Sequence, residues 1–287
     1  MVIGGGVLAA GRTVAFGFSG TGSIADYTAA VAAQRAVLAQ HPQLVDLVRY
    51  AMLAANGHNT QPWRFQADPR RIAILPDFSR RTPAVDSDDH HLFVSLGCTA
   101  ENLALAATAT GRRGELRFDP EDAIAFEFGA APPERSALFD AIPKRQSTRA
   151  DYDGRAVPAA ARVPGIDLVL LTDRPRIERV LELVLTGNRA QMYDPAFMRK
   201  LKHWLRFNPR QALASSDGLY GPASGNPVLP GWLGGPTFEL AFRVSSENDK
   251  YARQLRSSAA IAIFVSKRAD KDHWVRTGRA CPQALRR

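Results

Sequence analysis

The segment from residue 55 to 65 gathers polar groups that suit the edge of a flat ring. It reads ANGHNTQPWRF, so a predicted helix end is followed by amide side chains, a proline and a tryptophan. Amides both donate and accept hydrogen bonds, and a turn adds exposed backbone N–H groups, which together match the rim of a planar heteroaromatic ring. A helix-to-strand connector, in which Asn59 and Gln61 only satisfy backbone groups, explains the same residues equally well.

A second segment, residues 142–152, carries closely spaced basic residues. It reads IPKRQSTRADY, and its Arg145, Ser147 and Arg149 alternate along the chain. In an extended backbone, alternate side chains project to the same side. Two guanidinium groups that flank a hydroxyl could clamp a phosphate or a polyol through charge-assisted hydrogen bonds. The alternative is a solvated basic linker, which such runs commonly form.

Other groups of reactive side chains have simpler explanations. The run 86–91 reads DSDDHH, but adjacent His residues on a helix point different ways, so a capped, acidic helix start is favoured over a metal site. No G-x-S-x-G is present to anchor a hydrolase triad. Cys98 lies in an apolar helical stretch and is interpreted as a small hydrophobe. Residues 20–25, GTGSIA, imitate a dinucleotide fingerprint without the β-α-β pattern that it needs.

Regular hydrophobic patterns frame the first polar segment. Helical spacing of apolar residues alternates with short runs of period two, separated by Gly, Pro and Asp turns. The predicted elements are a helix over residues 41–55, strands Trp63–Gln66 and Ile72–Leu75, a largely buried helix from a cap at Ser87 to Gly111, and strands Glu115–Phe118 and Ala123–Phe128.

A similar order begins again after the Ala-Ala-Pro-Pro boundary at residues 130–133. The predicted elements are a short helix at 138–142, a strand Leu168–Thr172, a helix Ile177–Leu185, a helix around Phe197–Phe207 after a break at Asp194–Pro195, and a fully buried strand Ala259–Val265. Residues 215–235 are rich in Gly, Pro and Ser without clear periodicity, which predicts a lid or a binding loop. These patterns predict an α+β fold with two similar halves.

The composition is that of an ordinary folded protein. Of 287 residues, 45% are hydrophobic and 23% are charged, which excludes wholesale disorder. The two cysteines, Cys98 and Cys281, have no neighbours at metal-ligand spacing, so a zinc ribbon and a disulfide-dense scaffold are excluded. No unbroken apolar run of about 18 residues follows the N-terminus, so no stable membrane span is expected.

The positive charge is concentrated near the end of the chain. The net charge is +9, and residues 243–287 hold 11 Lys or Arg against 4 Asp or Glu. A basic face attracts phosphates on nucleic acid, on anionic lipid or on a phosphorylated cofactor. Because no nucleic-acid module or interleaved aromatic pattern accompanies the charge, nucleic acid is not expected as a partner.

Together the two polar segments resemble the nitroreductase family of flavoproteins, and in particular its single-chain, duplicated branch, often called Acg-type. In that family an R-x-S-x-R segment of one subunit grips FMN, while an N-x-Q-P-W segment of the partner borders the isoalloxazine ring. The run HNTQPW at 58–63 matches the second motif, and RQSTR at 145–149 matches the first. Further likeness runs through 197–209 and 274–279, so the resemblance covers about residues 41–280.

The resemblance implies an α+β, nitroreductase-like fold with an antiparallel-rich sheet flanked by helices, in which two similar halves mimic the family's dimer. Residues 1–40 are expected to be an apolar leader or signal-like segment with a lead-in helix. Residues 41–130 form the first expected half, and residues 134–287 form the second. A monomer that acts as a pseudo-dimer is expected, with a homodimer as the alternative.

FMN is the cofactor that the resemblance implies, with NAD(P)H as the electron donor. The phosphate carries a charge near −2 and requires cationic donors, so Arg145, Ser147 and Arg149 are expected at the ribityl phosphate and the O2 side of the flavin. The residues expected at the ring edge are Asn56, Gly57, His58, Asn59 and Gln61. No catalytic acid or base is expected, because the cofactor supplies the redox chemistry.

The implied activity is electron transfer from NAD(P)H to small quinone or nitroaromatic acceptors. One alternative is a non-catalytic FMN-binding or flavin-sequestering protein whose 215–235 loop closes over the flavin. The other alternative is a degenerate product that binds nothing.

Both ends of the chain depart from the family pattern. The family continues beyond the equivalent of residue 287 with the rest of a helix and a final strand, so a truncated C-terminus that lacks a phosphate ligand and some core packing is expected. Met1–Ser19 is small and apolar like the core of an export signal, but it has no positively charged n-region. Localisation is therefore left open between the cytoplasm and the periplasm.

Overall fold

The computed structural model describes residues 20–119, 121, 123–147, 151–155 and 165–284 of the chain. The leader Met1–Ser19 and Arg149 therefore lie outside the described residues. Helices and antiparallel strands both occur throughout the described part, as the predicted α+β class requires.

A four-stranded antiparallel sheet has the strand order β1-β2-β4-β3. Its strands are β1 (Trp63–Asp68), β2 (Arg71–Pro76), β3 (Arg112–Phe118) and β4 (Ile124–Ala130). Both predicted hairpins are confirmed, because β1 pairs with β2 and β3 pairs with β4. The central strands β2 and β4 carry the β-branched and aromatic residues that this environment favours, and Ile72, Ile74 and Phe126 are fully buried.

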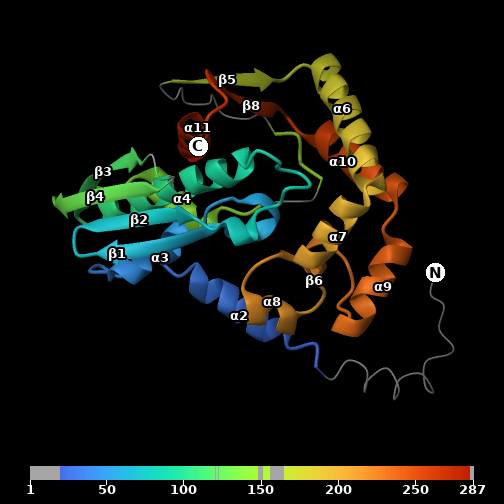
Figure 1. Cartoon of the computed structure of the whole chain (residues 1–287), viewed down its shortest axis with the longest axis horizontal. Coiled ribbons are helices and arrows are strands. Elements are labelled where there is room, and N and C mark those ends of the chain that lie inside the picture. The colour runs from blue at the N-terminus through green and yellow to red at the C-terminus, as the bar shows by residue number, and fades with distance from the viewer. Residues whose placement is uncertain (1–19, 120, 122, 148–150, 156–164, 285–287) are drawn as a thin grey trace.

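Helix α4 (His90–Ala109) forms the centre of the core. It packs on β2, β3 and β4 and against helix α3 (Leu44–Ala51) (Figure 1). Its Phe93, Leu96 and Leu103 have no exposed surface. By length and composition α4 could cross a membrane, but 72% of the relevant window is buried inside the protein. Its place in the core accounts for its apolar character.

Helix α11 (Lys271–Ala284) crosses α4 at very short range. A Cβ added at Gly97 would collide with the backbone carbonyl of Val275, and one added at Gly278 would collide with that of Val94. Glycine at both positions removes the side chains that would otherwise separate the two backbones. Through this crossing, the last described helix joins the same hydrophobic core as the sheet, with Val275 buried in it.

A group of helices lies beside this core (Figure 1). It comprises α6 (Arg174–Tyr193), α7 (Pro195–Trp204), α9 (Gly231–Ala241) and α10 (Val244–Ser257). Helix α6 packs against both α10 and α7. The predicted break between α6 and α7 is confirmed, since the side chain of Asp194 accepts a hydrogen bond from the N–H of Ala196 and Pro195 begins the new helix.

Short elements connect these layers. They are α2 (Ile24–Gln34), α5 (Ala137–Ala141), α8 (Pro209–Ser215), the parallel strands β6 (Leu205–Arg206) and β7 (Leu219–Tyr220), and the 3₁₀ turns η1 (Gly57–Asn59), η2 (Phe78–Arg80), η3 (Ile142–Lys144) and η4 (Gly221–Ser224). Ser23 caps α2 by accepting a hydrogen bond from the N–H of Asp26. The glycine-containing run at residues 20–25 therefore ends in the first turn of this helix. Helix α2 packs on α8.

The prediction of a fully buried strand at 259–265 is wrong in its burial. Strand β8 (Ile261–Ser266) pairs with β5 (Ile166–Leu171) in a two-stranded antiparallel sheet. Ile263 and Val265 remain 38% and 43% exposed. Helix α11 packs against this sheet. A continuous apolar run is buried on both sides only where layers cover both faces, and the exposed side chains of β8 lack that cover within the described part of the chain.

The prediction that residues 215–235 form a lid or a binding loop is incomplete, because part of this segment has regular structure. The segment contains the end of α8, strand β7, turn η4 and the first turns of α9. Helix α9 was not predicted because its first turns are rich in Gly and Pro, and both residue types disfavour helix interiors in general.

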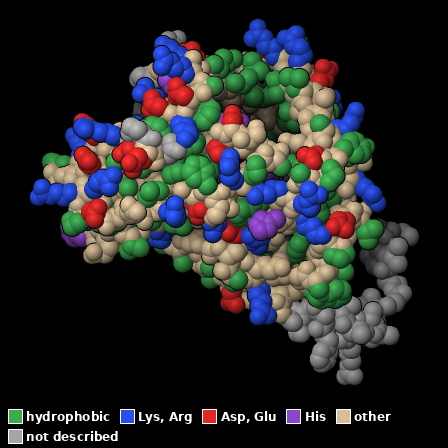
Figure 2. All heavy atoms as spheres, in the orientation of Figure 1, with side chains coloured by type: hydrophobic (Ala, Val, Ile, Leu, Met, Phe, Trp, Pro, Cys, Tyr) green, Lys and Arg blue, Asp and Glu red, His purple; other side chains and the backbone are tan. Residues whose placement is uncertain are grey.

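The surface carries mixed charges. On the face shown in Figure 2, Lys and Arg side chains are interspersed with Asp, Glu and hydrophobic side chains and form no continuous basic stripe.

Candidate functional site

The polar segment after α3 forms a strained corner, which we define as residues 56–61. His58, Asn59 and Gln61 have positive φ angles of 50°, 51° and 50°. Non-glycine residues rarely adopt this left-handed conformation. Each such residue costs on the order of 1 kcal/mol or more, and such residues concentrate at functional sites. Three of them lie within four positions, whereas the other two described non-glycine residues with positive φ, Asp89 and Ser216, are isolated.

Asn56 holds the corner closed from within. Its side-chain Oδ1 accepts a hydrogen bond from the backbone N–H of Gln61 at 2.9 Å, and its Nδ2 donates to the carbonyl of Ala54 at 3.2 Å. The N–H of Thr60 donates to the carbonyl of Gly57 at 3.0 Å. The Asn56 amide therefore fixes the path of the backbone around the corner.

The corner is fastened to a distant segment, residues 216–218, which we call the clamp. Asn59 donates from Nδ2 to the carbonyl of Gly218 at 3.1 Å, and the Gly218 N–H donates back to the carbonyl of Asn59 at 2.9 Å. Gln61 donates from Nε2 to the carbonyl of Ser216 at 2.5 Å. Both amides thus serve backbone groups of the clamp, as the connector interpretation of this segment expected.

Asp217, at the middle of the clamp, is paired with two arginines. Its carboxylate accepts from Arg80 Nη1 at 2.7 Å and from Arg206 Nη2 at 2.5 Å. Arg80 also donates to the carbonyl of Thr60 in the corner at 2.9 Å. Burial alone would raise the pKa of Asp217, but the hydrogen bonds from Arg206, Ser215 and Arg80 outweigh it and hold this pKa below its usual value.

We expect Asp217→Asn to loosen the corner, because two arginines then lose their counter-charge. At neutral pH the free energy of unfolding should fall by about 1–3 kcal/mol, measured by urea denaturation. Because the pKa of Asp217 is lowered on folding, its contribution is present above the ordinary aspartate pKa of about 3.9 and fades as the pH falls through the folded-state value. The exposed Asp153→Asn is the matched control, and an equal loss in both variants would contradict the assignment.

Arg145 lies at the turn that leads from α3 into the corner. Its Nε and Nη2 donate to the carbonyl of Leu53 at 3.3 and 2.9 Å, and its Nη1 donates to Ser147 Oγ at 3.3 Å. Arg35 donates to the carbonyls of Pro143 and Arg145 and so holds this backbone. Burial and the nearby Arg35 lower the pKa of Arg145. Arg145 therefore contacts the turn that precedes the corner, three residues before Asn56.

The half-buried Arg145 has no acidic partner in the described part of the chain. Its hydrogen-bond acceptors there are a carbonyl and a hydroxyl. A guanidinium has five N–H donors, and these contacts use three of them. A partly desolvated cation with spare donors favours an anionic ligand. Ser147 is exposed beside it, whereas Arg149, the third predicted member, lies outside the described residues.

Open space and two unsatisfied polar atoms occur on segments of the candidate site. A Cβ added at Gly57 would meet nothing within 4 Å, so space is open there. The buried indole N–H of Trp63 and the buried hydroxyl of Tyr220 have no hydrogen-bond partner among the described residues. Buried donors are normally satisfied. The spare donors of Arg145 suit an anionic group, and the two buried polar atoms without a partner could each form a hydrogen bond with a polar ligand.

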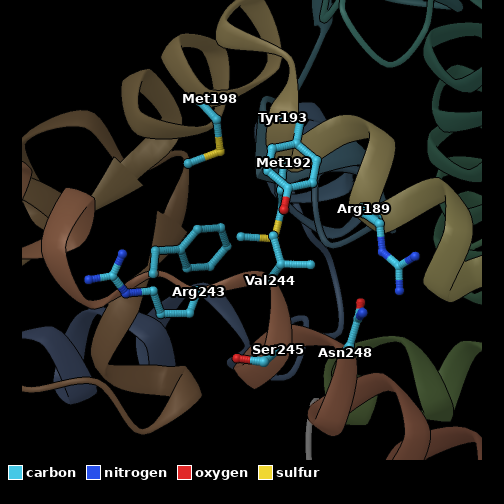
Figure 3. Close-up of a pocket in the computed structure, with 9 residues that line it drawn as sticks. Arg189, Met192, Tyr193, Met198, Arg243, Val244, Ser245 and Asn248 are labelled. Atoms are coloured by element: carbon cyan, nitrogen blue, oxygen red, sulfur yellow. The ribbon is translucent and has the colours of Figure 1, made fainter.

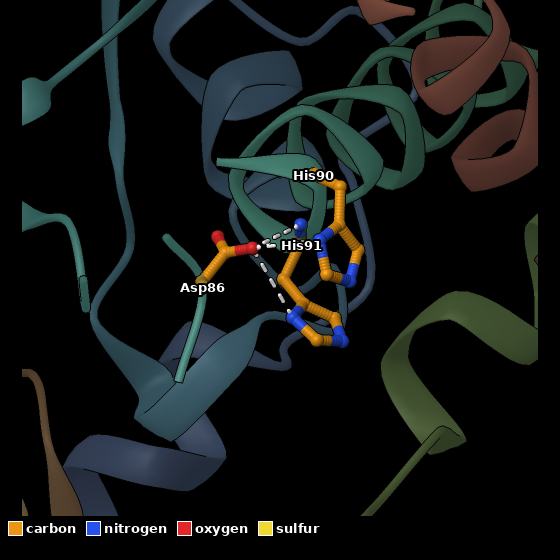
Figure 4. Close-up of side chains that lie close together, drawn as sticks. All are labelled: Asp86, His90 and His91. Atoms are coloured by element: carbon orange, nitrogen blue, oxygen red, sulfur yellow. Dashed lines mark hydrogen bonds and ion pairs between the residues drawn. The ribbon is translucent and has the colours of Figure 1, made fainter. Parts of the chain in front are cut away.

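Asp86, His90 and His91 cluster at the start of α4 (Figure 4). Asp86 is buried, and its two oxygens accept from the N–H groups of His91 and Leu92 at 2.9 and 3.0 Å. The helix begins three residues after the predicted cap at Ser87. The prediction that the rings point apart is wrong, because both Nδ1 atoms lie 3.1–3.3 Å from Asp86 Oδ1. The backbone contacts of Asp86 still favour a helix cap over a metal ligand.

We expect Asp86→Ala to lower the free energy of unfolding by about 1–2 kcal/mol, because two backbone N–H groups of α4 lose their acceptor. Thermal unfolding measures this loss, and the exposed Asp88→Ala serves as control. Added Zn²⁺ should leave the Tm of the wild type unchanged. A zinc-dependent rise in Tm that Asp86→Ala abolishes would contradict the cap assignment.

A cavity of about 600 Å³ lies elsewhere, where α6, α7 and the start of α10 meet (Figure 3). Arg189 and Arg243 lie on opposite sides of it, with Met192, Met198 and Tyr193 between them. None of the predicted cofactor residues lines this cavity. It therefore gives no support to the predicted FMN site.

The clamp and its two arginines were missed from the sequence. Asp217-Gly218 is a typical turn dipeptide, and Gly218 has a positive φ of 78°. That turn could have been predicted, but its partner could not, because 137 positions separate Arg80 from Asp217. Only the folded chain brings them together.

The fold and site together define an α+β protein with a strained polar corner beside a partly buried arginine. No family model matches the sequence. The chain is similar to two curated proteins of Mycobacterium tuberculosis, from strains CDC 1551 and H37Rv, each named "Putative NAD(P)H nitroreductase". Each is 27% identical over 198 residues, which cover 62% of this chain and 52% of the relative. The chain thus spans about half the length of the curated relatives it matches. This distant similarity supports a relationship to the nitroreductase family.

Proposed function

We propose that this protein is an FMN-binding oxidoreductase of the nitroreductase type, which passes electrons from NAD(P)H to quinone or nitroaromatic acceptors. The observation that carries the proposal is the half-buried Arg145, which lacks an acidic partner in the described part of the chain and donates to Leu53, three residues before the strained corner begins. The names of the two similar mycobacterial proteins support the reaction class.

In this proposal the two polar segments hold FMN from opposite sides. Arg145, Ser147 and Arg149 bind the phosphate and the O2 side of the flavin. The residues at the ring edge are Asn56, Gly57, His58, Asn59 and Gln61. Bound FMN would supply two-electron redox chemistry. The chain's own residues would position the flavin, neutralise its phosphate and exclude water from its ring.

The proposal includes a division of the chain into two nitroreductase-like halves, residues 41–130 and 134–287, which build one flavin site between them. Two contacts of the structure support it. Arg145 of the second half donates to Leu53 of the first, and Gly218 of the second half exchanges hydrogen bonds with Asn59 of the first. A single chain would then serve as a pseudo-dimer.

A second candidate function is FMN binding without turnover. The specific observation in its favour is the clamp, because residues 216–218 already cover the corner with hydrogen bonds to Asn59 and Gln61. A segment fastened there would keep NAD(P)H and acceptors away from a flavin beneath it. In this case the protein stores or sequesters FMN.

Reconstitution with FMN separates these functions. The protein is incubated with FMN, passed through a desalting column and examined for flavin absorbance, and NADH or NADPH is then added without oxygen. Retained flavin that NAD(P)H bleaches supports the oxidoreductase. Retained flavin that stays oxidised supports the non-catalytic alternative. A colourless protein that retains no flavin overturns both.

A further inference from the structure

The two cysteines of the chain meet at the crossing of α4 and α11. Cys98 lies one residue after Gly97 on α4, and Cys281 lies three residues after Gly278 on α11. A Cβ added at Gly278 would lie 2.9 Å from the backbone nitrogen of Cys98. The paired glycines therefore bring the two helix backbones close enough for the adjacent thiols to contact each other.

The two thiols share one environment at this crossing. The Cys98 thiol lies 3.2 Å from the carbonyl of Gly278, to which it can donate, and it is also within hydrogen-bond reach of the Cys281 thiol. Both side chains belong to the same hydrophobic cluster. Cys98 is only 5% exposed, whereas Cys281 is of intermediate exposure. Solvent can therefore reach this pair from the Cys281 side.

Their environment gives the thiols different reactivities. The hydrogen bond from Cys98 lowers the pKa of Cys281, because it stabilises the Cys281 thiolate against the opposing effect of burial. The same hydrogen bond, followed by burial, raises the pKa of Cys98. A thiolate is the nucleophilic form of cysteine. The more accessible thiol is thus also the more reactive of the two.

We propose that Cys98 and Cys281 are a redox-active pair, which a peroxide oxidises to a disulfide that locks α11 onto α4. In the first step the Cys281 thiolate attacks one oxygen of hydrogen peroxide. The O–O bond breaks, an S–O bond forms, and hydroxide leaves and takes up a proton to give water. Cys281 is then a sulfenic acid.

In the second step the Cys98 sulfur attacks the Cys281 sulfur. An S–S bond forms, the S–O bond breaks, and the departing hydroxide takes the Cys98 proton to give a second water. Together the two sulfurs lose the two electrons that the peroxide gains. The resulting disulfide ties α11, the last described helix, to α4 at the centre of the core. A thiol reductant would break this disulfide by thiol–disulfide exchange and free α11 again.

Treatment of the purified protein with hydrogen peroxide tests this pair. Thiol titration should fall from two groups to none, and the intact mass should decrease by two hydrogens without formation of a covalent dimer. The Tm of the oxidised protein should rise by about 5 °C or more, because the bond crosslinks distant parts of the chain. Dithiothreitol should reverse both changes. Intermolecular dimers, or two thiols that persist, would overturn the proposal.

Two single variants test which thiol reacts with peroxide and which one resolves the sulfenic acid. Neither variant can form the Cys98–Cys281 disulfide. In Cys98→Ser, peroxide should leave a sulfenic acid on Cys281 that dimedone traps, since its resolving partner is missing. In Cys281→Ser, the buried Cys98 should stay reduced and the Tm should not respond to peroxide. Dimedone labelling of Cys98 in Cys281→Ser, or a Tm rise with peroxide in either variant, would contradict the roles.

Discussion

Gly278→Ala is expected to destabilise the protein by about 2–3 kcal/mol, although alanine is the better helix former. The added Cβ would collide with the backbone carbonyl of Val94 on α4, and backbone cannot move aside as a flexible side chain can. The helices must separate, which opens the core where Val275 is buried. Urea denaturation followed by circular dichroism measures the loss.

Gly187→Ala is the matched control for this substitution. Gly187 also lies inside a helix, α6, but a Cβ there would meet nothing within 4 Å. Helix propensity alone predicts a gain of about 0.5–1 kcal/mol at such a position. The two variants should therefore change stability in opposite directions. Equal gains would show that α4 and α11 do not cross at Gly278.

Arg145→Ala is expected to weaken FMN binding by about 10- to 100-fold, because the variant loses a charge-assisted hydrogen bond to the phosphate. The flavin-free protein should change in stability by no more than about 1 kcal/mol. The variant loses the hydrogen bonds to Leu53, which lowers the free energy of unfolding. It also removes a half-buried cation without an acidic partner, and the relief of that desolvation cost offsets the loss. Fluorescence quenching of FMN and thermal unfolding measure the two effects.

Two further substitutions make the Arg145 result specific. Arg145→Lys keeps the charge but loses the forked donor geometry, so its affinity should lie between those of wild type and Arg145→Ala. Arg117→Ala removes an exposed arginine from the edge strand β3 and should leave the affinity unchanged. Equal FMN affinity in wild type and Arg145→Ala would remove Arg145 from the phosphate site.

The sequence predicted the first sheet and its central helix well. Regular patterns place strands within Trp63–Asp68, Arg71–Pro76 and Arg112–Phe118 and a fourth that overlaps Ile124–Ala130, and the structure confirms them. Local spacing is sufficient there because each hairpin closes within a few residues and α4 carries apolar residues along most of its length. Burial and hydrogen-bond partners were predicted less well where a residue is surrounded by segments that are distant in the sequence.

The second part of the chain illustrates that limit. The apolar residues of β8 predicted burial, yet Val265 is exposed, because composition does not reveal which layers cover a strand. In the candidate site, Arg145 contacts Leu53 just before the corner, and the expected roles of both segments in cofactor binding stay predictions. The strained φ angles and the partners of Asp217 could not be predicted, since both arise from long-range contacts.

The central claim is that a phosphate-bearing flavin binds between the corner at residues 56–61 and the segment that carries Arg145. A paired titration of the wild-type protein with FMN and with riboflavin, followed by flavin fluorescence, tests this claim most directly. The account predicts saturable, one-to-one quenching of FMN and markedly weaker binding of riboflavin, which lacks the phosphate. Absence of saturable FMN binding, or equal affinity for the two flavins, would contradict it.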